Sequence, residues 1–566
     1  MMWHGVGGQG KSTRLREFVR SLDEHNNSEL LSGRDNRAIL AKIDFDDERL
    51  KRIDVALYTL RLQLGNHSGL IFPAFDAAFV SYYRKTRPGV DVEAEFPELF
   101  RGEKEALADL LDVIGENVSL AADLASVALP GAGLIYKWGA RLTGKLRAWW
   151  AARGSRLLGG IENMSPEELL QSLPSFLGSD LCDGIASKPH LRPVVILDTY
   201  EALWRGRGQK DGLTDRRADG WVRLLVQDSP GALFVIAGRE RLRWREINSA
   251  WDQVIESRLL GGLSDEDADE FLRGVPIGEP EIRRRIVAGA RQLPFYLDIQ
   301  VSQYEMLRDS GEQLREDLFG GSSGEILARF LEHMNDGDQS LFRLASYGRT
   351  ITRDLMDSVA AAFPSRAINY SFDALVSRSA FSEVAEGVYT LHLLLREELQ
   401  KRELKDGLSA YRNVHRHLFE YHHAWLIALP ADLSNDSALR LGAAVRFEAA
   451  FDHLMVASSD DAITWLITYQ LWVGGLGEWQ LVERLHAQAL QAWKQNRSRP
   501  DRELAILRCN ISAALEHIGR YDDAEAYLES ALSDVKDIGD NLQGLTGLAH
   551  LNLGELLCRR EATADA

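Results

Sequence analysis

The amino-terminal part of this chain contains the stretch Gly5-Val6-Gly7-Gly8-Gln9-Gly10-Lys11-Ser12-Thr13. Its first eight residues fit the pattern G-x-x-x-x-G-K-[ST] at every fixed position. Glycine has no Cβ, so the backbone N–H groups of such a stretch can point at phosphate oxygens without a steric clash. The stretch therefore predicts a phosphate-binding loop for a nucleoside triphosphate, which we expect to be ATP with Mg²⁺.

The residues on either side of the loop fit that prediction. Met1–His4 remain for a short strand before the loop, and a helix is expected from Lys11 to about Leu22. Lys11 would neutralise the β- and γ-phosphates, Ser12 would ligate Mg²⁺, and the positive end of the helix would face the phosphates. The alternative is a chance glycine-rich turn, and the helix that follows argues against it.

Three apolar runs predict strands of one parallel sheet. They are Arg37–Phe45 (RAILAKIDF), Arg192–Asp198 (RPVVILD) and Ala232–Ala237 (ALFVIA). Continuous apolar runs are typical of strands that are buried on both faces. Because helical segments alternate with them, the fold class is a doubly wound α/β sheet. Ligands of such sheets bind at the carboxyl ends of the strands.

Two acids lie at one of these strand ends. Asp198 ends the second long run, where it is expected to hold Mg²⁺, and the alternative role is a helix cap. Glu201 follows three residues later and could orient or deprotonate the attacking water. For Glu201, a solvated charge on a helix is a nearly equal alternative. Both residues are catalytic candidates together with Lys11.

Arg239 follows the strand Ala232–Ala237 and is the fourth catalytic candidate. From a neighbouring strand end its planar guanidinium could bind oxygens of the γ-phosphate in pairs. A surface salt bridge is the alternative role. Arg241 and Arg243 are weaker candidates for the same task.

Composition limits the other classes of function. The chain has 566 residues, enough for about three to four domains, and a formal net charge of −18. That charge disfavours a nucleic-acid binder. Cys182, Cys509 and Cys558 are far apart, which argues against a disulfide framework or a spaced zinc site and fits the reducing cytoplasm.

A mostly helical insertion is expected at about residues 66–190, and its role is not assigned. Within it, Val118–Tyr136 (VSLAADLASVALPGAGLIY) is apolar enough to need a membrane check. The stretch is near the lower length limit for a spanning helix, and Pro130 and two glycines interrupt it. A buried helical hairpin is the better prediction, so we expect no membrane partner.

The carboxyl-terminal half is expected to be helical. A capped helix begins at Ser264. Helices followed by a hairpin at Phe381–Leu391 predict a winged-helix module. After about residue 405 the chain contains a repeat, because Gly477-Glu478-Trp479 recurs as Gly519-Arg520-Tyr521 at a shift of 42 residues. A third copy begins at LNLGELL (551–557), and the repeat array is expected to be a piece of a longer one.

The stretches GVGGQGKST, VVILDTYEAL, VIAGRERL and GARQLPFYL occur in that order. In this order they resemble the STAND class of signal-transducing P-loop ATPases, which is related to the NB-ARC and NACHT groups. The resemblance implies that Pro294 packs near the adenine and that His392, in the sequence Tyr-Thr-Leu-His-Leu, senses the β-phosphate. Leu393 departs from the family pattern at the position after this histidine, and a helix-end or core histidine is an equal alternative. The repeats resemble tetratricopeptide repeats.

The expected architecture has four parts. They are a P-loop NTPase domain at 1–262 with its insertion, a helical lid at 263–324, a winged-helix module at 325–404 and an α-solenoid of tetratricopeptide-like repeats at 405–566. Residues 405–566 are expected to bind the trigger and not to touch ATP. A chain ending at about residue 404 is therefore expected to keep nucleotide binding.

These expectations describe an ATP-dependent switch in the cytoplasm. ADP would hold the modules closed, a protein or peptide trigger on the repeats would allow exchange for ATP, and slow hydrolysis would act as a timer. The resemblance also allows open protomers to form a homo-oligomer. Two alternatives stay open, namely a transcription regulator that uses the winged helix on DNA and a repeat scaffold with a structural ATP site.

Overall fold

The computed structural model describes residues 1–5, 10–31, 37–66, 69–87, 92, 96, 99, 161, 164–203, 218–275, 277–334, 336–378, 380–430, 433, 436–497, 499–538 and 543–564. The chain forms two compact units, and neither is continuous in sequence. The first comprises Met1–Asp47, Val194–Gln209 and Leu233–Tyr421, and the second comprises Glu48–Pro193, Lys210–Ala232 and His422–Ala566. The domain boundaries after residues 262, 324 and 404 stay predictions.

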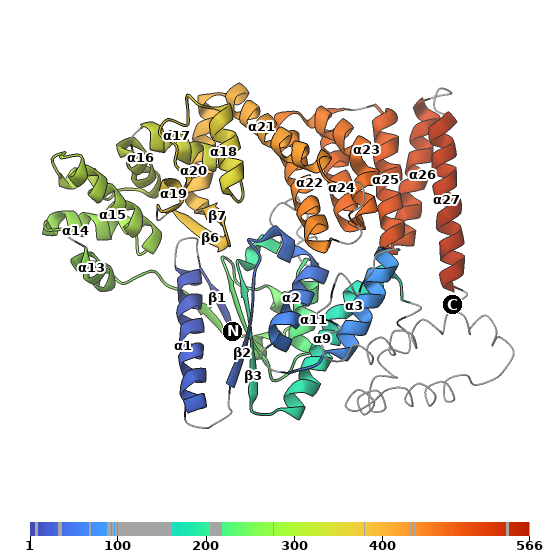
Figure 1. The fold of residues 1–566 in the computed structure, drawn as a ribbon, viewed down its shortest axis with the longest axis horizontal. Coiled ribbons are helices and arrows are strands. Elements are labelled where there is room, and N and C mark those ends of the chain that lie inside the picture. The colour runs from blue at the N-terminus through green and yellow to red at the C-terminus, as the bar shows by residue number, and fades with distance from the viewer. Residues whose placement is uncertain are drawn as a thin grey trace. The chain divides into compact units, whose positions relative to one another are not determined.

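The first unit contains a parallel five-stranded sheet, as the apolar runs predict (Figure 1). Its strands are β1 (Met2–His4), β2 (Arg37–Asp44), β3 (Leu191–Asp198), β4 (Leu233–Gly238) and β5 (Ser257–Leu259). Their order across the sheet is β2-β3-β4-β1-β5. Sequence analysis missed β5, because three residues with the sequence Ser-Arg-Leu carry no strand pattern.

The order places β4 between β1, which leads into the predicted phosphate loop, and β3, which ends at Asp198. His4 at the end of β1 is in register with Gly238 at the end of β4. Leu197 of β3 is in register with Ile236 of β4. The carboxyl ends of β1, β4 and β3 therefore meet at one edge of the sheet, where a ligand of a parallel sheet binds.

Helix α1 (Lys11–Leu31) covers one face of this sheet. Its Leu15 is fully buried against Trp3, Val194 and Val235, and burying such a side chain contributes about 1.5–3 kcal/mol. The predicted end at about Leu22 is wrong, because the helix continues to Leu31. Its polar second half is held by Asn26, whose amide exchanges two hydrogen bonds with the backbone of Ala38, at 2.9 and 2.8 Å.

The rest of the first unit is helical apart from one hairpin. Its helices are α12 (Trp251–Val254), α13 (Asp265–Gly274), α14 (Pro280–Ala290), α15 (Pro294–Asp309), α16 (Ser323–His333), α17 (Asp336–Ala345), α18 (Arg353–Ala362), α19 (Phe372–Val376), α20 (Leu393–Asp406) and the first part of α21 (Leu408–Ile427). Strands β6 (Phe381–Ala385) and β7 (Val388–Leu391) pair antiparallel, which confirms the predicted hairpin. The predicted cap at Ser264 is also confirmed, since its side chain accepts from the Asp267 N–H at 3.0 Å.

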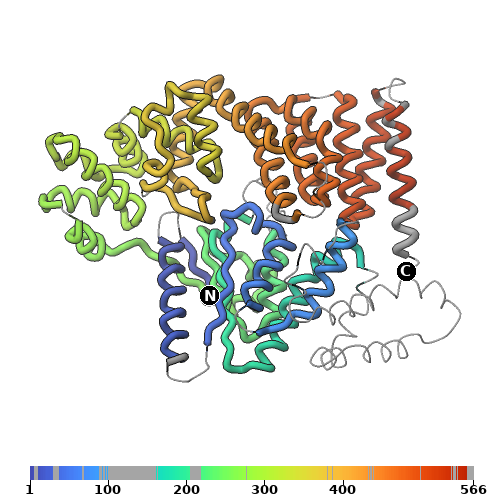
Figure 2. The backbone as a smooth tube through the Cα atoms, viewed as in Figure 1, coloured from blue at the N-terminus to red at the C-terminus, as the bar shows by residue number. Residues whose placement is uncertain are grey.

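The second unit is built from two sets of helices (Figures 1 and 2). The first set is α2 (Ile53–Asn66), α3 (Pro73–Thr86), α9 (Pro166–Ser187) and α11 (Gly220–Gln227). The second set is α22 (Ser437–Ala457), α23 (Ser459–Gly475), α24 (Trp479–Asn496), α25 (Arg502–Ile518), α26 (Tyr521–Ile538) and α27 (Gln543–Ala564). The second set lies side by side in sequence order (Figure 1).

Equivalent turns recur at the 42-residue spacing found in the sequence. Gly477 and Gly519 both have left-handed backbone, with φ of +76° and +97°. Each turn is closely packed by the first set of helices. A Cβ on Gly477 would lie 2.3 Å from Cγ of Arg87, and a Cβ on Gly519 would lie 2.7 Å from Cβ of Ser165. Glycine is therefore required at both turns by conformation and by space.

Buried charges join the two sets of helices in the second unit. The carboxylate of Glu478 pairs with Arg87 at 2.9 Å and also with Arg52. Arg52 pairs in turn with Asp54 at 2.7 Å. The Arg87 and Glu478 side chains are only 4% and 7% exposed. Since a buried charge is tolerated only when it is paired, these contacts tie the end of α3 to the turn before α24.

The apolar stretch Val118–Tyr136 lies outside the described residues. Among the helices that the structure describes, none is long and apolar enough to cross a membrane.

Candidate nucleotide-binding site

The two ends of the predicted phosphate loop lie at the edge where the strands end. Gly5 follows β1, and its N–H donates to the Gly238 oxygen at 3.3 Å. Gly10 has a φ of +77°, which favours glycine, and precedes α1. Val6, Gly7, Gly8 and Gln9 lie outside the described residues.

Lys11 begins helix α1 and turns back toward the loop. Its Nζ donates to the Gly5 oxygen at 2.7 Å. Burial lowers the pKa of Lys11, as does the charge of Arg239, whereas Glu201 and Asp198 act in the opposite direction. The predicted catalytic residues therefore lie close enough to act on one another electrostatically. Ser12 and Thr13 follow in the first turn of the helix, where both are exposed.

Asp198 is 2% exposed at the end of β3. Its Oδ1 accepts from the Thr199 N–H at 2.9 Å. Thr199 has a φ of +50°, an unusual conformation for a residue other than glycine. Burial raises the pKa of Asp198 to about 6, helped by the neighbouring charge of Asp44, while the Ser12 side chain and the Thr199 N–H act against the shift.

The surroundings of Asp198 suit a divalent cation. Its buried Oδ2 has no hydrogen-bond partner within reach among the described residues. Burying the ionised carboxylate of Asp198 is costly without a counter-charge, and a bound cation would supply one. Its oxygens and the nearby Ser12 hydroxyl are ligands that Mg²⁺ prefers. The described residues contain no group of three or more His, Cys, Asp or Glu side chains that could hold a metal ion. In nucleotide sites, Mg²⁺ is usually held by one or two carboxylates together with phosphates and water.

Glu201 lies in a short 3₁₀ helix, Tyr200–Leu203, directly after β3. Both of its carboxylate oxygens contact Arg239. Oε1 is 3.0 Å from Nε of Arg239, and Oε2 accepts from the backbone N–H of Arg239 at 3.1 Å. Glu201 is 7% exposed, so the alternative role of a solvated surface charge is wrong.

Pro294 is the first residue of α15 and lies beside the loop. A Cβ on Gly10 would be 4.0 Å from Cγ of Pro294. Arg291 and Gln292, which precede it, both have positive φ, at 48° and 65°. Gly262 allows this turn, since a Cβ there would lie 2.2 Å from the Gln292 side chain and carbonyl. Positive φ at two residues other than glycine indicates backbone strain just before Pro294, which lies beside Gly10 of the predicted loop. Such strain is typical of functional segments.

His392 follows β7 and caps α20 without a hydrogen bond from its side chain. Burial lowers the pKa of His392 to about 4, and the charges of Arg239 and Lys11 lower it further. The imidazole is therefore neutral at pH 7 and lies within the electrostatic range of the predicted phosphate-binding residues. Its buried Nδ1 has no hydrogen-bond partner among the described residues.

The sequence analysis missed two residues of this region. Phe295 stacks on His392, but in the sequence it resembles an ordinary core aromatic. Asp44 ends β2 and raises the pKa of Asp198, and its place at the end of an apolar run was the available signal. Burial lowers the pKa of His4, and the charge of Arg241, one of the weaker arginine candidates, lowers it further. Arg243 is 71% exposed and lies 3.6 Å from Glu240.

No family profile matches the chain, and no curated protein matches it either. A solved structure that it resembles is the crystal structure of a Signal Transduction ATPase with Numerous Domains (STAND) protein with a tetratricopeptide repeat sensor from Pyrococcus horikoshii, at 13% identity and a TM-score of 0.36, covering 84% of this chain and 68% of that chain. The described residues themselves form a parallel five-stranded sheet with many helices and a cluster of polar residues at its carboxyl edge.

Proposed function

We propose that this chain binds ATP with Mg²⁺ at the carboxyl edge of its sheet and acts as a signal-transducing molecular switch of the STAND type. One observation carries the proposal. The ends of β3 and β4 bring Asp198, Glu201 and Arg239 to one edge of the sheet, where Glu201 contacts Arg239 at 3.0 Å and all three charges act on the pKa of Lys11. Cations beside a phosphate loop and a buried acid beside a serine hydroxyl are what a Mg²⁺-nucleotide needs.

The geometry supports one set of proposed roles. Gly5, Gly10 and the loop between them would hold the phosphates, with Lys11 on the β- and γ-phosphates. Asp198 and Ser12 would hold Mg²⁺. Arg239 would contact the γ-phosphate, and Glu201 would orient the attacking water. When Mg²⁺ is bound, it would polarise the phosphate oxygens.

The switch would use residues from outside the sheet. Pro294 lies against Gly10, and His392 lies within the electrostatic range of Lys11. The first residue belongs to α15 and the second to the segment after the hairpin. A nucleotide that contacts both would bias the equilibrium between arrangements of the 263–324 lid and the 325–404 winged-helix module. Hydrolysis in such a switch would be slow.

The helices after residue 405 would be a tetratricopeptide-like sensor for a protein or peptide trigger. Consecutive helices pack side by side, and the turns at Gly477 and Gly519 repeat with the same left-handed backbone. Stacked helix pairs of this kind present extended surfaces that bind peptides. We further propose a cytoplasmic location and self-assembly of open protomers.

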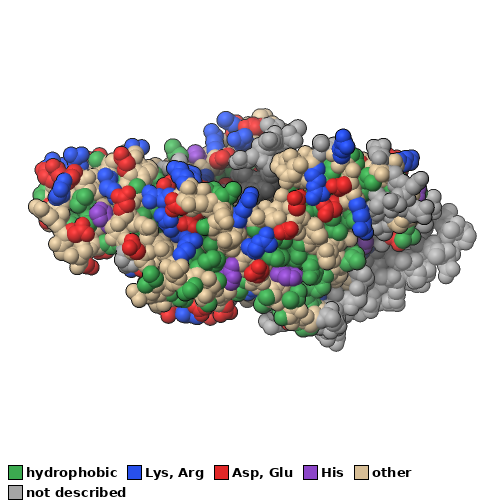
Figure 3. Space-filling model, turned by 90° about the horizontal axis from the view of Figure 1, so that it is seen from above, with side chains coloured by type: hydrophobic (Ala, Val, Ile, Leu, Met, Phe, Trp, Pro, Cys, Tyr) green, Lys and Arg blue, Asp and Glu red, His purple; other side chains and the backbone are tan. Residues whose placement is uncertain are grey.

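The DNA-binding alternative has less in its favour. Arginines of the 325–404 segment already contact acids: Arg366 pairs with Glu403, Arg378 with Asp338 and Arg353 with Asp373. In Figure 3, basic and acidic side chains are interspersed on the visible face. The neighbouring carboxylates offset part of the positive charge that this segment would present to a phosphate backbone.

Calorimetric titration with Mg²⁺-ATP and Mg²⁺-ADP tests the proposal. Binding of both nucleotides, with slow phosphate release, is the expected result. A chain that binds neither would show that the loop is structural. Hydrogen exchange of the 263–404 segment in the two nucleotide states then separates a switch, which would show different protection, from a scaffold with a structural ATP site, which would not.

A further inference from the structure

The contact between Glu201 and Arg239 uses both oxygens of the carboxylate. One oxygen takes the side-chain Nε at 3.0 Å, and the other takes the backbone N–H at 3.1 Å. The two side chains are 9% and 26% exposed. A largely buried carboxylate that is held by two donors of one residue has a defined position, and it offsets the charge of that residue.

The pairing conflicts with the roles expected of the two residues. Glu201 can orient a water molecule only if its oxygens are free to accept from it. Arg239 presents its full charge to a phosphate only if no carboxylate already neutralises it. Each residue therefore limits what the other can do.

We propose that Glu201 and the γ-phosphate compete for the side chain of Arg239. This inference rests on the proposed function and adds a regulatory rule to the same site. A terminal phosphate carries more negative charge than a carboxylate and offers three acceptor oxygens, so it attracts the guanidinium more strongly. The pair lies near Lys11, which is expected to bind the β- and γ-phosphates, because the charges of Glu201 and Arg239 both act on Lys11. A diphosphate has no third phosphate and leaves the pair closed.

The consequence is that Glu201 becomes available only when a triphosphate is bound. The backbone N–H of Arg239 stays with the carboxylate in either state, because the end of β4 does not need to move. Only the contact from Nε is exchanged. Arg239 thus acts as the positioning residue for Glu201 and at the same time distinguishes ATP from ADP.

Glu201→Gln isolates this contact. The glutamine oxygen can still accept from the Arg239 N–H, while its NH₂ group cannot accept from Nε. We expect Glu201→Gln to bind a slowly hydrolysed ATP analogue on the order of fivefold more tightly, with the affinity for ADP unchanged. Arg239→Gln is expected to lose the preference for the triphosphate, and adding Glu201→Gln to it should then change neither affinity.

Glu240→Gln is the matched control, since Glu240 pairs with Arg243 at 3.6 Å and is 61% exposed. It should leave both affinities as they are. Binding is measured by fluorescence with the full chain, so no turnover is needed. Weaker triphosphate binding by Glu201→Gln would mean that Glu201 orients Arg239 and would overturn the inference.

Tighter binding that persists in the Arg239→Gln background would assign the effect to simple charge repulsion and would also overturn it. Either outcome leaves the proposed function standing, because nucleotide still binds. If the natural chain binds neither nucleotide, the proposed function fails and this inference fails with it.

Discussion

The ring of His392 stacks on the ring of Phe295, with 3.7 Å between their centroids and 12° between their planes. Phe295 adjoins Pro294, which lies beside Gly10 of the predicted phosphate loop. A line of contacts therefore leads from the loop through the start of α15 to the segment after the hairpin. In the proposed switch, a nucleotide at the predicted loop would act through this line on both the 263–324 and the 325–404 segment.

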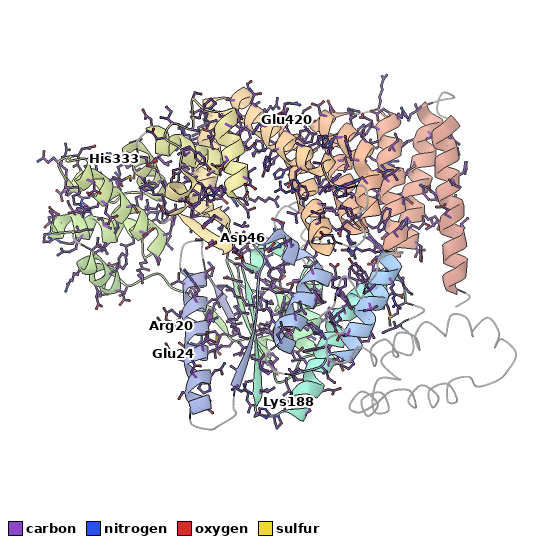
Figure 4. The ribbon with its side chains drawn as sticks, in the orientation of Figure 1. Arg20, Glu24, Asp46, Lys188, His333 and Glu420 are labelled. Atoms are coloured by element: carbon purple, nitrogen blue, oxygen red, sulfur yellow. The ribbon has the colours of Figure 1, made fainter. Side chains whose placement is uncertain are left out.

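Replacing Lys11 by alanine should lower the affinity for ATP at least about tenfold, because a charged contact worth ~1.5–3 kcal/mol is lost. The fold should stay intact, since Lys11 contacts Gly5 at the end of the loop and is not part of the core. Calorimetric titration measures the effect. Arg20→Ala is the control, because Arg20 is 68% exposed on the same helix and pairs with Glu17. It also lies 3.8 Å from Glu24 (Figure 4). Equal affinities of Lys11→Ala and the natural chain would remove the loop from the nucleotide site.

Replacing Asp198 by asparagine should have two opposite effects. Without nucleotide the chain should become more stable at pH 7, by up to about 2–3 kcal/mol, because an ionised carboxylate with a pKa near 6 no longer has to stay buried. Binding of ATP should lose its dependence on Mg²⁺. Thermal melting and titration with and without the metal measure the two effects. Asp46→Asn, at an acid just beyond β2, should show neither (Figure 4). A loss of stability would mean that Asp198 serves as a structural acceptor.

The Mg²⁺-dependent part of ATP affinity should fall as the pH drops through about 6. The folded pKa of Asp198 is raised above the ordinary value of about 4, so its proton is held more tightly in the folded chain and competes with the metal below that pH. The same shift means that its contribution to stability is fully present below about pH 4 and is lost as pH rises through about 6. Titrating Asp198→Asn under the same conditions subtracts the ionisation of ATP itself. A natural chain whose pH profile matches that of the variant would contradict this assignment.

Replacing Glu478 by glutamine should destabilise the second unit by about 3 kcal/mol, because Arg52 and Arg87 lose a shared buried counter-charge. The melting temperature should fall, and hydrogen exchange should increase at the end of α3 and the start of α24. Glu529→Gln, an exposed acid on α26, is the control. An unchanged melting temperature would show that this ionic cluster adds nothing to the packing of the two helix sets.

Acid should weaken the second unit through His486, which is fully buried on α24. Its Nδ1 lies 2.8 Å from the Val482 oxygen and its Nε2 lies 3.2 Å from Nδ2 of Asn510. Burial lowers the pKa of His486 to about 4, so the folded state resists protonation and its stability falls as pH drops from about 6.5 towards 4. In this window His486→Gln should flatten the decline of melting temperature. If the two chains decline in parallel, another group causes the acid effect.

The parts of the fold that follow local patterns could be predicted from the sequence. β3 and β4 were found because strands buried on both faces have continuous apolar runs. The edge strand β5 was missed because only three residues form it, and the second half of α1 was missed because it depends on Asn26 and Ala38, not on apolar spacing. At the site, the strand ends indicated Asp198 and Arg239. The pairing of Arg239 with Glu201 could not be predicted, because charge and spacing do not reveal which of several nearby partners a side chain selects.

Contacts between distant segments had no sequence signal at all. Arg87 and Glu478 are 391 positions apart, and each alone resembles a surface charge. The predicted insertion therefore had no assigned role, although its described helices α3 and α9 pack on the turns of the repeat.

The second unit consists of three separate stretches of the chain. The helices at its carboxyl-terminal end therefore cannot be exchanged alone, either in evolution or in protein engineering. Exchange of the helices after residue 404 between related proteins by one recombination event would import turns without the Arg87 and Ser165 that pack on them. The described helices of residues 48–193 would have to be transplanted together with the repeats. Sequence changes in the two regions should accordingly be correlated, and chimeras should fold only when both come from one parent.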